Sequence, residues 1–339
     1  MVKIGTHNGT FHCDEALAIY LLRTLEEYKD AEVVRSRDPE KLSECDIVVD
    51  VGGVYDPAHH RYDHHQREFK DTFSDMYTTK LSSAGLVYKH FGKRIIAQLL
   101  KLDVQDEKVT ILYEKVYEAF IHALDAIDNG VPRYDGDLPP KYHDGTNLSS
   151  RVSHLLPWWN EKQDDLDERF QKAVALTGSE FEGRVRYLGG AWLPGRSLVF
   201  EAIQNRFNFH PSGKIVVFEK FAPWKDHLFK LEAELGLPAD SLTYVVYPDE
   251  FGGTHRVQAI PTVPSSFKSR LPLPEPWCGV RDDALSTLST IPGCVFVHAS
   301  GFIGGNKTRE GAIAMASSSL EMAGLFNQNN AESKKPRLE

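Results

Sequence analysis

The sequence has few cysteines and no long hydrophobic segment, and each absence excludes a class of protein. The four cysteines lie far apart in the 339 residues and form no CxxC pair: Cys13, Cys45, Cys278 and Cys294. This spacing fits free thiols in a reducing compartment better than a disulfide framework or a zinc ribbon. No run of about 18 or more apolar residues is present, so we expect no membrane span.

The ends of the chain and its charge also limit what it can do. Residues 1–5 lead directly into a strand pattern, with neither the apolar core of a signal peptide nor an Arg/Ser-rich transit segment. We therefore expect a soluble, intracellular protein. The formal net charge of −9 argues against broad, non-specific binding of a long polyphosphate, although it leaves a local basic cleft open. Residues 327–339 are polar, and we expect residues 326–339 to form a disordered tail.

The hydrophobic pattern of residues 1–160 predicts an α/β domain. Strand patterns lie at 2–7, 32–37 and 46–51, and helical patterns begin at Asp14 and recur at 82–91 and 106–128. The near-continuous apolar run at 46–51 is typical of a parallel strand that is buried on both faces. This order of elements favours a doubly wound, mainly parallel sheet.

The remaining residues predict a connecting helix and a second, smaller domain. Residues 161–190 form a long helical pattern that is acidic at its start and basic at its end, as the helix dipole favours. Residues 191–325 predict an α+β domain with one sheet. Its strand patterns lie at 197–203, 215–218, 242–247, 256–260 and 294–299, and its helical patterns at 225–235 and 308–323.

Histidine and aspartate residues stand at predicted strand ends and helix starts in the first domain. His7 ends the first strand, and His12 and Asp14 open the helix that follows. In a doubly wound sheet the carboxyl ends of the strands form the binding crevice. His12 and Asp14 are two residues apart and point the same way in an extended segment. Imidazole and carboxylate ligands suit Mn²⁺, Fe²⁺ or Zn²⁺, while polar residues that cap a loop are the alternative interpretation.

Two further acids lie where a charge is costly to bury. Asp50 stands inside an apolar strand, just before Gly52-Gly53, and needs either a metal or a salt-bridge partner there. Asp128 continues the inward-facing apolar row of its helix beyond Leu124, whereas Asp125 lies further off that row. Both Asp50 and Asp128 are therefore candidate ligands.

Asp63-His64-His65 forms another candidate segment. Adjacent residues cannot both face one metal from a strand, so we expect one histidine to be a ligand and the other to contact substrate or donate a proton. A chance grouping is the alternative, because the chain has 14 histidines and a second pair, His59-His60, to which we assign no role. Four segments that place His or Asp at such positions together indicate two metals bridged by a carboxylate.

These residues resemble the four motifs of the DHH phosphoesterase superfamily, and most closely the melanocyte-proliferating-gene protein family within it. The resemblance rests on residues 9–15 (GTFHCDE), 63–66 (DHHQ) and 298–307 (HASGFIGGNK), and it extends over about residues 1–325. It implies a DHH-like catalytic domain, a C-terminal domain that binds substrate, and 3′→5′ exonuclease activity on RNA. It also implies two Mn²⁺ ions, with Mg²⁺ or another divalent ion as alternatives, and the nucleus, the mitochondrion or the cytoplasm as the location.

The resemblance implies a role for each side chain of the first domain. The implied ligands are His7, His12 and Asp50 for one ion, and Asp14, Asp50, His64 and Asp128 for the other. A water between the two ions would attack phosphorus. Asp63 and His65 are the implied catalytic pair, in which Asp63 orients its neighbours and His65 contacts the phosphate or protonates the leaving oxygen. His12 departs from the Asp of many DHH enzymes, which enriches the first site in nitrogen.

A glycine-rich segment of the second domain is a candidate for substrate binding. It follows a predicted strand and precedes a predicted helix, where free backbone N–H groups suit a phosphate or a terminal nucleotide. A tight strand-to-helix turn is the alternative, but the DHH resemblance favours binding. The candidate substrate-binding residues are Arg256, His298, Gly304, Gly305, Asn306, Lys307 and Arg309.

We therefore expect a metal-dependent phosphodiesterase, namely a 3′→5′ exoribonuclease that a two-domain cleft restricts to the ends of RNA or short oligonucleotides. Two alternatives stay open. One is a hydrolase of small phosphate compounds such as pyrophosphate or a dinucleotide, which the acidic net charge favours. The other is a non-catalytic RNA-binding protein that keeps a metal for stability, against which the full set of ligands argues. The sequence leaves the oligomeric state and the metal's identity undetermined.

Overall fold

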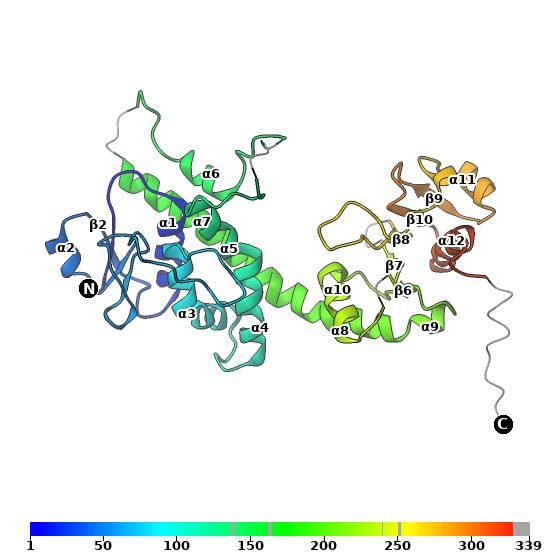
Figure 1. Cartoon of the computed structure of the whole chain (residues 1–339), viewed down its shortest axis with the longest axis horizontal. Coiled ribbons are helices and arrows are strands. Elements are labelled where there is room, and N and C mark those ends of the chain that lie inside the picture. The colour runs from blue at the N-terminus through cyan, green and yellow to red at the C-terminus, as the bar shows by residue number, and fades with distance from the viewer. Residues whose placement is uncertain (137–138, 140, 162–164, 239, 250–251, 328–339) are drawn as a thin grey trace. The chain divides into compact units, whose positions relative to one another are not determined.

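The computed structural model describes residues 1–327 except 137–138, 140, 162–164, 239 and 250–251 (Figure 1). The chain splits into two compact units that divide after Gly190. Most of the tail expected at 326–339, and the predicted start of the connecting helix, lie outside the described residues. No helix in the described part of the chain is long and apolar enough to cross a membrane.

The first unit contains a five-stranded, mainly parallel sheet. Its strands are β1 (Lys3–Thr6), β2 (Glu32–Arg35), β3 (Ile47–Val49), β4 (Tyr55–Asp56) and β5 (Arg61–Tyr62), in the order β2-β1-β3-β5-β4. Only β4 is antiparallel to its neighbour. The predicted α/β class is therefore confirmed. Because β1, β3 and β5 are parallel neighbours, the residues that follow them emerge at the same edge of the sheet.

Strand β5 was not predicted, because the loop-rich stretch in which it lies showed no strand pattern. Its two residues pair in parallel with β3, in the register Val48↔Arg61 and Val49↔Tyr62. Two residues are too few for a hydrophobic period to be visible in the sequence. This short pairing nevertheless fixes the position of Asp63-His64-His65, which follows β5 directly.

Helices cover both faces of this sheet. The helices of this unit are α1 (Cys13–Thr24), α2 (Pro39–Ser43), α3 (Ser83–Leu100), α4 (Glu107–Val116), α5 (His122–Asp128), α6 (Leu148–Ser153) and α7 (Leu166–Tyr187), of which α1 and α3 contact the strands directly. Helix α1 packs against α3 and α7 (Figure 1). Leu42 of α2 packs on Val48. Ile47 and Val49 point to the opposite face and are also fully buried, as expected for a doubly wound sheet.

A π-helical turn, Tyr117–Ile121, separates α4 from α5 and changes which residues face inward. Asp125 is fully buried, so the expectation that it lies off the inward row is wrong. It accepts hydrogen bonds from the backbone N–H of Ser82 (2.9 Å), from the Ser82 hydroxyl (2.7 Å) and from the Tyr117 hydroxyl (2.9 Å). Asp125 thus ties α5 to the N-cap of α3.

The buried carboxylate of Asp125 should make the stability of the protein depend on pH. Burial raises the pKa of Asp125 to about 7, against about 3.9 in an unfolded chain. The contribution of Asp125 to the free energy of unfolding is therefore fully present below about pH 4, and it is lost as the pH rises through 7. Asp125→Asn keeps the acceptor oxygen and removes the titration. We expect wild type to lose stability relative to this variant as the pH rises from about 5 to 8, measured by chemical denaturation.

Two outcomes bear on this prediction. Asp125→Ala should lower the free energy of unfolding by about 3 kcal/mol, because it leaves the buried Ser82 and Tyr117 donors unpaired. A stability difference between wild type and Asp125→Asn that stays constant with pH would contradict the assigned pKa.

The second unit is an α+β fold with a five-stranded sheet. Its strands are β6 (Ile215–Val217), β7 (Tyr244–Pro248), β8 (His255–Ala259), β9 (Cys294–Val297) and β10 (Ile303–Asn306), in the order β6-β7-β8-β10-β9. Only β6 and β7 are parallel neighbours. Its helices are α8 (Leu193–Gln204), α9 (Arg206–Phe209), α10 (Trp224–Glu234), α11 (Asp282–Ser289) and α12 (Arg309–Met322).

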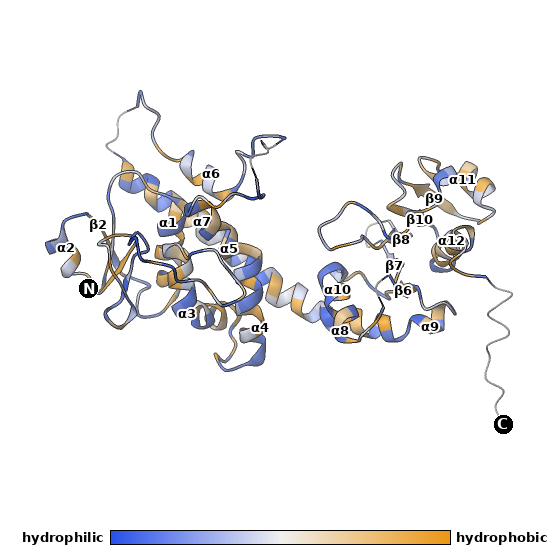
Figure 2. Cartoon of the chain, in the orientation of Figure 1, coloured by the Kyte–Doolittle hydropathy of each residue, from blue (hydrophilic) through white to orange (hydrophobic). Residues whose placement is uncertain are grey.

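Residues 197–203 were predicted to form a strand, and this prediction is wrong, because they belong to helix α8. A short apolar run does not distinguish a buried strand from a buried helix. Val199, Ala202 and Ile203 recur at helical spacing and pack in one core cluster with α10 and the sheet. In Figure 2, α8 and α10 carry both hydrophobic and hydrophilic residues, as helices with one buried side do.

Candidate metal centre

Five segments of the first unit bring acidic and imidazole side chains together. His7 follows β1, Asp50 follows β3, and Asp63-His64-His65 follows β5. Asp14 lies in the first turn of α1, and Asp128 is the last residue of α5. The site therefore stands at the carboxyl edge of a parallel sheet, where open α/β folds bind ligands.

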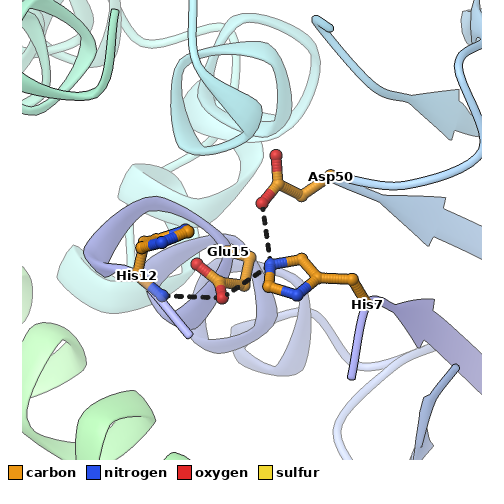
Figure 3. Close-up of side chains that lie close together, drawn as sticks. All are labelled: His7, His12, Glu15 and Asp50. Atoms are coloured by element: carbon orange, nitrogen blue, oxygen red, sulfur yellow. Dashed lines mark hydrogen bonds and ion pairs between the residues drawn. The ribbon is translucent and has the colours of Figure 1, made fainter. Parts of the chain in front are cut away.

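One group of side chains surrounds His7. One ligand atom from each of His7, His12, Glu15 and Asp50 lies within 4.8 Å of the others. Figure 3 shows two carboxylates at the same ring nitrogen of His7: the Nε2 atom lies 3.0 Å from Glu15 Oε1 and 3.3 Å from Asp50 Oδ2. His12 is exposed, whereas the other three side chains are buried. The predicted residues His7, His12 and Asp50 are thus brought together.

Glu15 belongs to this group but was not predicted as a ligand. Its side chain is fully buried, and its Oε1 atom also accepts a hydrogen bond from the His12 backbone N–H at 2.8 Å. The available signal was the spacing of a capping box, in which an acid three residues after the N-cap turns back onto it.

A second set of side chains surrounds His64. Its Nε2 atom lies 3.2 Å from Asp50 Oδ1 and 3.3 Å from Asp128 Oδ2. Asp14, His64 and Asp128 form one group, and Asp50, His64 and His65 form another. Asp50 therefore joins the His7 group to the His64 groups. Its backbone has a φ of 59°, a left-handed conformation that is strained for a residue other than glycine and that often marks a functional site.

The donor atoms of the site fit divalent metal ions. Two buried carboxylate oxygens of the site have no hydrogen-bond donor, Asp14 Oδ1 and Glu15 Oε2. An uncompensated carboxylate is costly to bury, and a cation removes that cost. The mixture of imidazole nitrogen and carboxylate oxygen suits Mn²⁺ and similar ions. Cys13 is buried next to Asp14 but belongs to none of these groups.

Several acidic and imidazole groups of the site have strongly shifted pKa values. Burial raises the pKa of Glu15 and of Asp128 to about 8 each. For Asp50, burial favours the neutral form, but hydrogen bonds from His64 and His7 outweigh it and lower the pKa to about 2. For His7, burial favours the neutral form, but hydrogen bonds to Asp50 and Glu15 raise the pKa to about 10. Protons on these groups must therefore leave when a cation enters.

Asp63 and His65, the predicted catalytic pair, are joined to each other. Asp63 Oδ1 lies 2.7 Å from His65 Nδ1 and accepts the His65 backbone N–H, and Asp63 Oδ2 accepts the Gly53 N–H at 2.6 Å. The hydrogen bond to Asp63 raises the pKa of His65. Asp63 is buried and belongs to no ligand group, whereas His65 is 62% exposed. Asp63 therefore orients the ring of His65.

The glycines of the second unit are placed differently from the prediction. Gly304, Gly305 and Asn306 form strand β10, which is paired on one side with β8 and on the other with β9. The expectation of glycines at the start of a helix is wrong, because α12 begins at Arg309 after a Thr308 N-cap. Because Gly305 has no side chain, the Arg256 side chain can lie against it. A Cβ atom at position 305 would be only 2.7 Å from Arg256 Nη1, which is too close.

Two of the predicted cations of the second unit, Arg256 and Arg309, have acidic partners. Arg256 donates a hydrogen bond to Asp249 at 2.5 Å and lies over the Phe296 ring, and Arg309 pairs with Glu219 at 3.1 Å. A phosphate would have to compete with these carboxylates. His298 is exposed, with its Nδ1 atom 3.0 Å from the Ser300 hydroxyl, and Lys307 is also exposed. The roles of these residues stay predictions.

The fold and the site define an α/β protein with a candidate centre for divalent metal ions. Residues 3–320 match the model of a family described as an uncharacterised protein family (UPF0160). The chain is 54% identical over 332 residues to the human MYG1 exonuclease, a match that covers 96% of this chain and 88% of the human one. It is 51% identical to the MYG1 protein of Schizosaccharomyces pombe, with 97% and 99% covered. The chain therefore belongs to the MYG1 family, as its motifs predicted.

Among solved structures, a crystal structure of the exonuclease RecJ bound to manganese is similar at 12% identity, covering 98% of this chain and 92% of that chain. The TM-score of 0.24 is too low to support an argument about the fold or the site.

Binding of Mn²⁺ should stabilise the protein through Asp50. At a metal concentration about 100 times Kd, a ligand that binds only the folded state adds about 2.7 kcal/mol to the free energy of unfolding. We expect Asp50→Asn to remove most of this increment, because Asp50 joins the ligand groups. The Mn²⁺-dependent shift of Tm measures it, and Asp30→Asn, at an exposed site, is the control. An equal shift in Asp50→Asn and wild type would count against the centre.

Metal binding should also release protons. Because the pKa values of Glu15 and Asp128 are near 8, both carboxyls hold protons at pH 7 that a metal displaces, so the affinity for Mn²⁺ should rise between about pH 6 and 9. Calorimetry in two buffers of different ionisation enthalpy counts the protons released. Glu15→Gln should release fewer protons than wild type. A binding heat that does not depend on the buffer would show that neither carboxyl is a protonated ligand.

Proposed function

We propose that this protein is a metal-dependent phosphodiesterase that removes nucleotides from the 3′ ends of RNA. The observation that carries the proposal is the strained, buried Asp50, which links the His7 group to the His64 groups. Two ligand groups that share one carboxylate suit a pair of divalent ions. The names of the mammalian relatives, including those of human and Bos taurus, describe exonucleases and support the same class of reaction.

In this proposal the ligand groups divide between two ions. His7, His12 and Asp50 hold the first, with Glu15 as a further ligand, and Asp14, Asp50, His64 and Asp128 hold the second. When bound, such ions lower the pKa of a coordinated water and withdraw charge from phosphoryl oxygens. Mn²⁺ remains the expected metal, with Mg²⁺ as the alternative.

The chain itself supplies the proton for the leaving oxygen. His65 is more than half exposed, and the buried carboxylate of Asp63 fixes its Nδ1 side. That hydrogen bond raises the pKa of His65, which keeps its ring protonated at a higher pH. The Nε2–H is then directed away from Asp63 and is available as a general acid.

The remaining expectations depend on the resemblance to DHH enzymes. They are a DHH-like catalytic domain at residues 1–160, a connecting helix at 161–190 and a substrate-binding domain at 191–325. The choice of RNA over DNA and a nuclear or mitochondrial location have the same basis. Hydrolysis of pyrophosphate or of dinucleotides is the second candidate, because a net charge of −9 does not favour a long polyphosphate.

Replacing Asp63, His64 and His65 together by alanine should abolish the Mn²⁺-dependent shortening of 5′-labelled RNA. His65→Gln alone should lower kcat by about 10² or more, the usual contribution of a general acid, and leave the Mn²⁺-induced shift of Tm unchanged. His59→Gln is the matched control, because His59 is an exposed histidine of the neighbouring pair. Full RNA shortening by the triple variant would refute the proposal.

Parallel incubations of wild type with 5′-labelled RNA, DNA, dinucleotides and pyrophosphate separate the alternatives. Cleavage from the 3′ end gives a ladder of shortened labelled products, whereas cleavage from the 5′ end releases labelled mononucleotide at once. Turnover of pyrophosphate or dinucleotides alone would favour the second candidate. Metal binding without turnover of any substrate would indicate the non-catalytic alternative.

A further inference from the structure

A cavity of the first unit lies over the candidate metal centre. Its volume is about 600 Å³, and its lining includes Asp50, His64 and Asp128 on one part and Arg67 and Lys80 on another. Ligand pockets usually measure about 300–1,000 Å³. A single phosphate would fill only a small part of this volume, so the cavity has room for more of a nucleotide strand.

Arg67 and Lys80, which we call the cationic rim, have no acidic partner. Both side chains are exposed, and in the part of the chain that the structure describes neither side chain makes an ion pair or a hydrogen bond. Other exposed cations of this unit, such as Lys70, also lack an ion pair among the described residues, but Arg67 and Lys80 are the ones that line the cavity. A cavity that contains carboxylates and unpaired cations leaves space for a ligand that contacts both.

The backbone that carries Lys80 is firmly held. Lys80 forms an antiparallel bridge with Thr72, and its carbonyl accepts a hydrogen bond from the Asn129 side chain at 3.0 Å. Nearby, Phe73 stacks on Tyr117 with 3.7 Å between the ring centroids. A fixed backbone lowers the entropy that is lost when a ligand binds.

Arg67 is held in a similar way. It lies in a turn closed by the hydrogen bond from the Phe69 N–H to the Gln66 carbonyl at 3.0 Å. Phe69 is buried and contacts the rings of Tyr55 and His64. The turn is thus anchored beside the candidate ligand His64.

The charges of the cavity indicate what the cationic rim would bind. The carboxylates of Asp14, Asp50 and Asp128 offset the charge of bound metal ions, so a second phosphate near the centre needs cations of its own. Another part of the lining is apolar, with Leu124 and the half-exposed Ile127. Arginine and lysine are the side chains that bind phosphate oxygens.

We propose that Arg67 and Lys80 bind the phosphate next to the scissile one. The inference rests on the proposed function and deepens it, because it names the substrate class as a strand with at least two consecutive phosphates. A trinucleotide, which has two internucleotide phosphates, is then a much better substrate than a dinucleotide, which has one. The first unit by itself therefore contributes to the selection of chain length.

Steady-state kinetics on a pentanucleotide test the cationic rim. Lys80→Gln and Arg67→Gln should each lower kcat/KM about tenfold, mainly through KM, because each removes one charge-assisted contact to the substrate. Lys80→Arg and Arg67→Lys keep the charge and should restore most of this loss. Lys70→Gln is the matched control, since Lys70 is exposed in the same loop but does not line the cavity. Equal Tm values exclude misfolding as the cause.

A neutral methylphosphonate at the linkage next to the scissile one gives a sharper test. If the cationic rim binds that phosphate, the neutral substrate should lower kcat/KM of wild type about a hundredfold, but it should affect the double variant Arg67→Gln/Lys80→Gln much less, because both contacts are already lost. If the neutral linkage lowers kcat/KM by the same factor in the variant as in wild type, the inference is overturned. A methylphosphonate placed two linkages further away is the substrate control.

Binding without turnover separates this inference from the proposed function. In EDTA, fluorescence anisotropy of the labelled pentanucleotide should show weaker binding by Lys80→Gln, and the slope of log K against log salt should fall by about 0.7. If wild type cleaves no nucleic acid, the proposed function fails while this measurement still tests the rim. If wild type cleaves RNA and the rim variants behave like Lys70→Gln, the rim inference fails and the function stands.

Discussion

The structure of the site depends on one ionised carboxylate at the end of a central strand. Asp50 follows β3 with a left-handed backbone and contacts His7 on one side and His64 on the other. Burial opposes its charge, yet the two histidines hold its pKa near 2, so it stays negative at every physiological pH. Removing one member of such a buried pair costs about 3–5 kcal/mol, because the remaining charge loses its partner. Asp50 therefore holds together both the cluster and the strand ends around it.

The parallel pairing of β1, β3 and β5 brings the partners to Asp50. Each of these strands ends at the same edge, and each is followed by a histidine or an aspartate of the site. Helix α1 adds Asp14 and Glu15 from its first turn, where the positive end of the helix dipole favours acidic side chains. The π-helical turn before α5 then leaves Asp125 to anchor the helix in the core while Asp128 reaches His64. The structural acid Asp125 and the candidate ligand Asp128 thus lie within a single helical turn.

Much of this arrangement could be predicted from the sequence, and the exceptions have physical reasons. His7 and Asp50 were identified because a polar residue at the end of an apolar strand needs a partner, and His64 because it belongs to the segment Asp63-His64-His65. Asp125 was missed because a π-helical turn changes the register that an ordinary helical period assumes. Strand β5 is too short to show a period, and the apolar run of α8 fits a strand as well as a helix. Such features are decided by tertiary contacts that no local pattern contains.

The negative charges of the carboxylates in the candidate metal centre can be compensated either by protons or by a metal ion. Without a metal, the imidazole of His7 and the carboxyls of Glu15 and Asp128 retain protons, as their raised pKa values require. With a metal, those protons are replaced by the cation, and the buried oxygens that lack donors gain a partner. The fold therefore tolerates the empty site, because protons compensate the acids, and it gains stability when metal enters. Because protons or a cation can offset these carboxylates, the cationic rim that we propose for substrate binding is not needed to neutralise them.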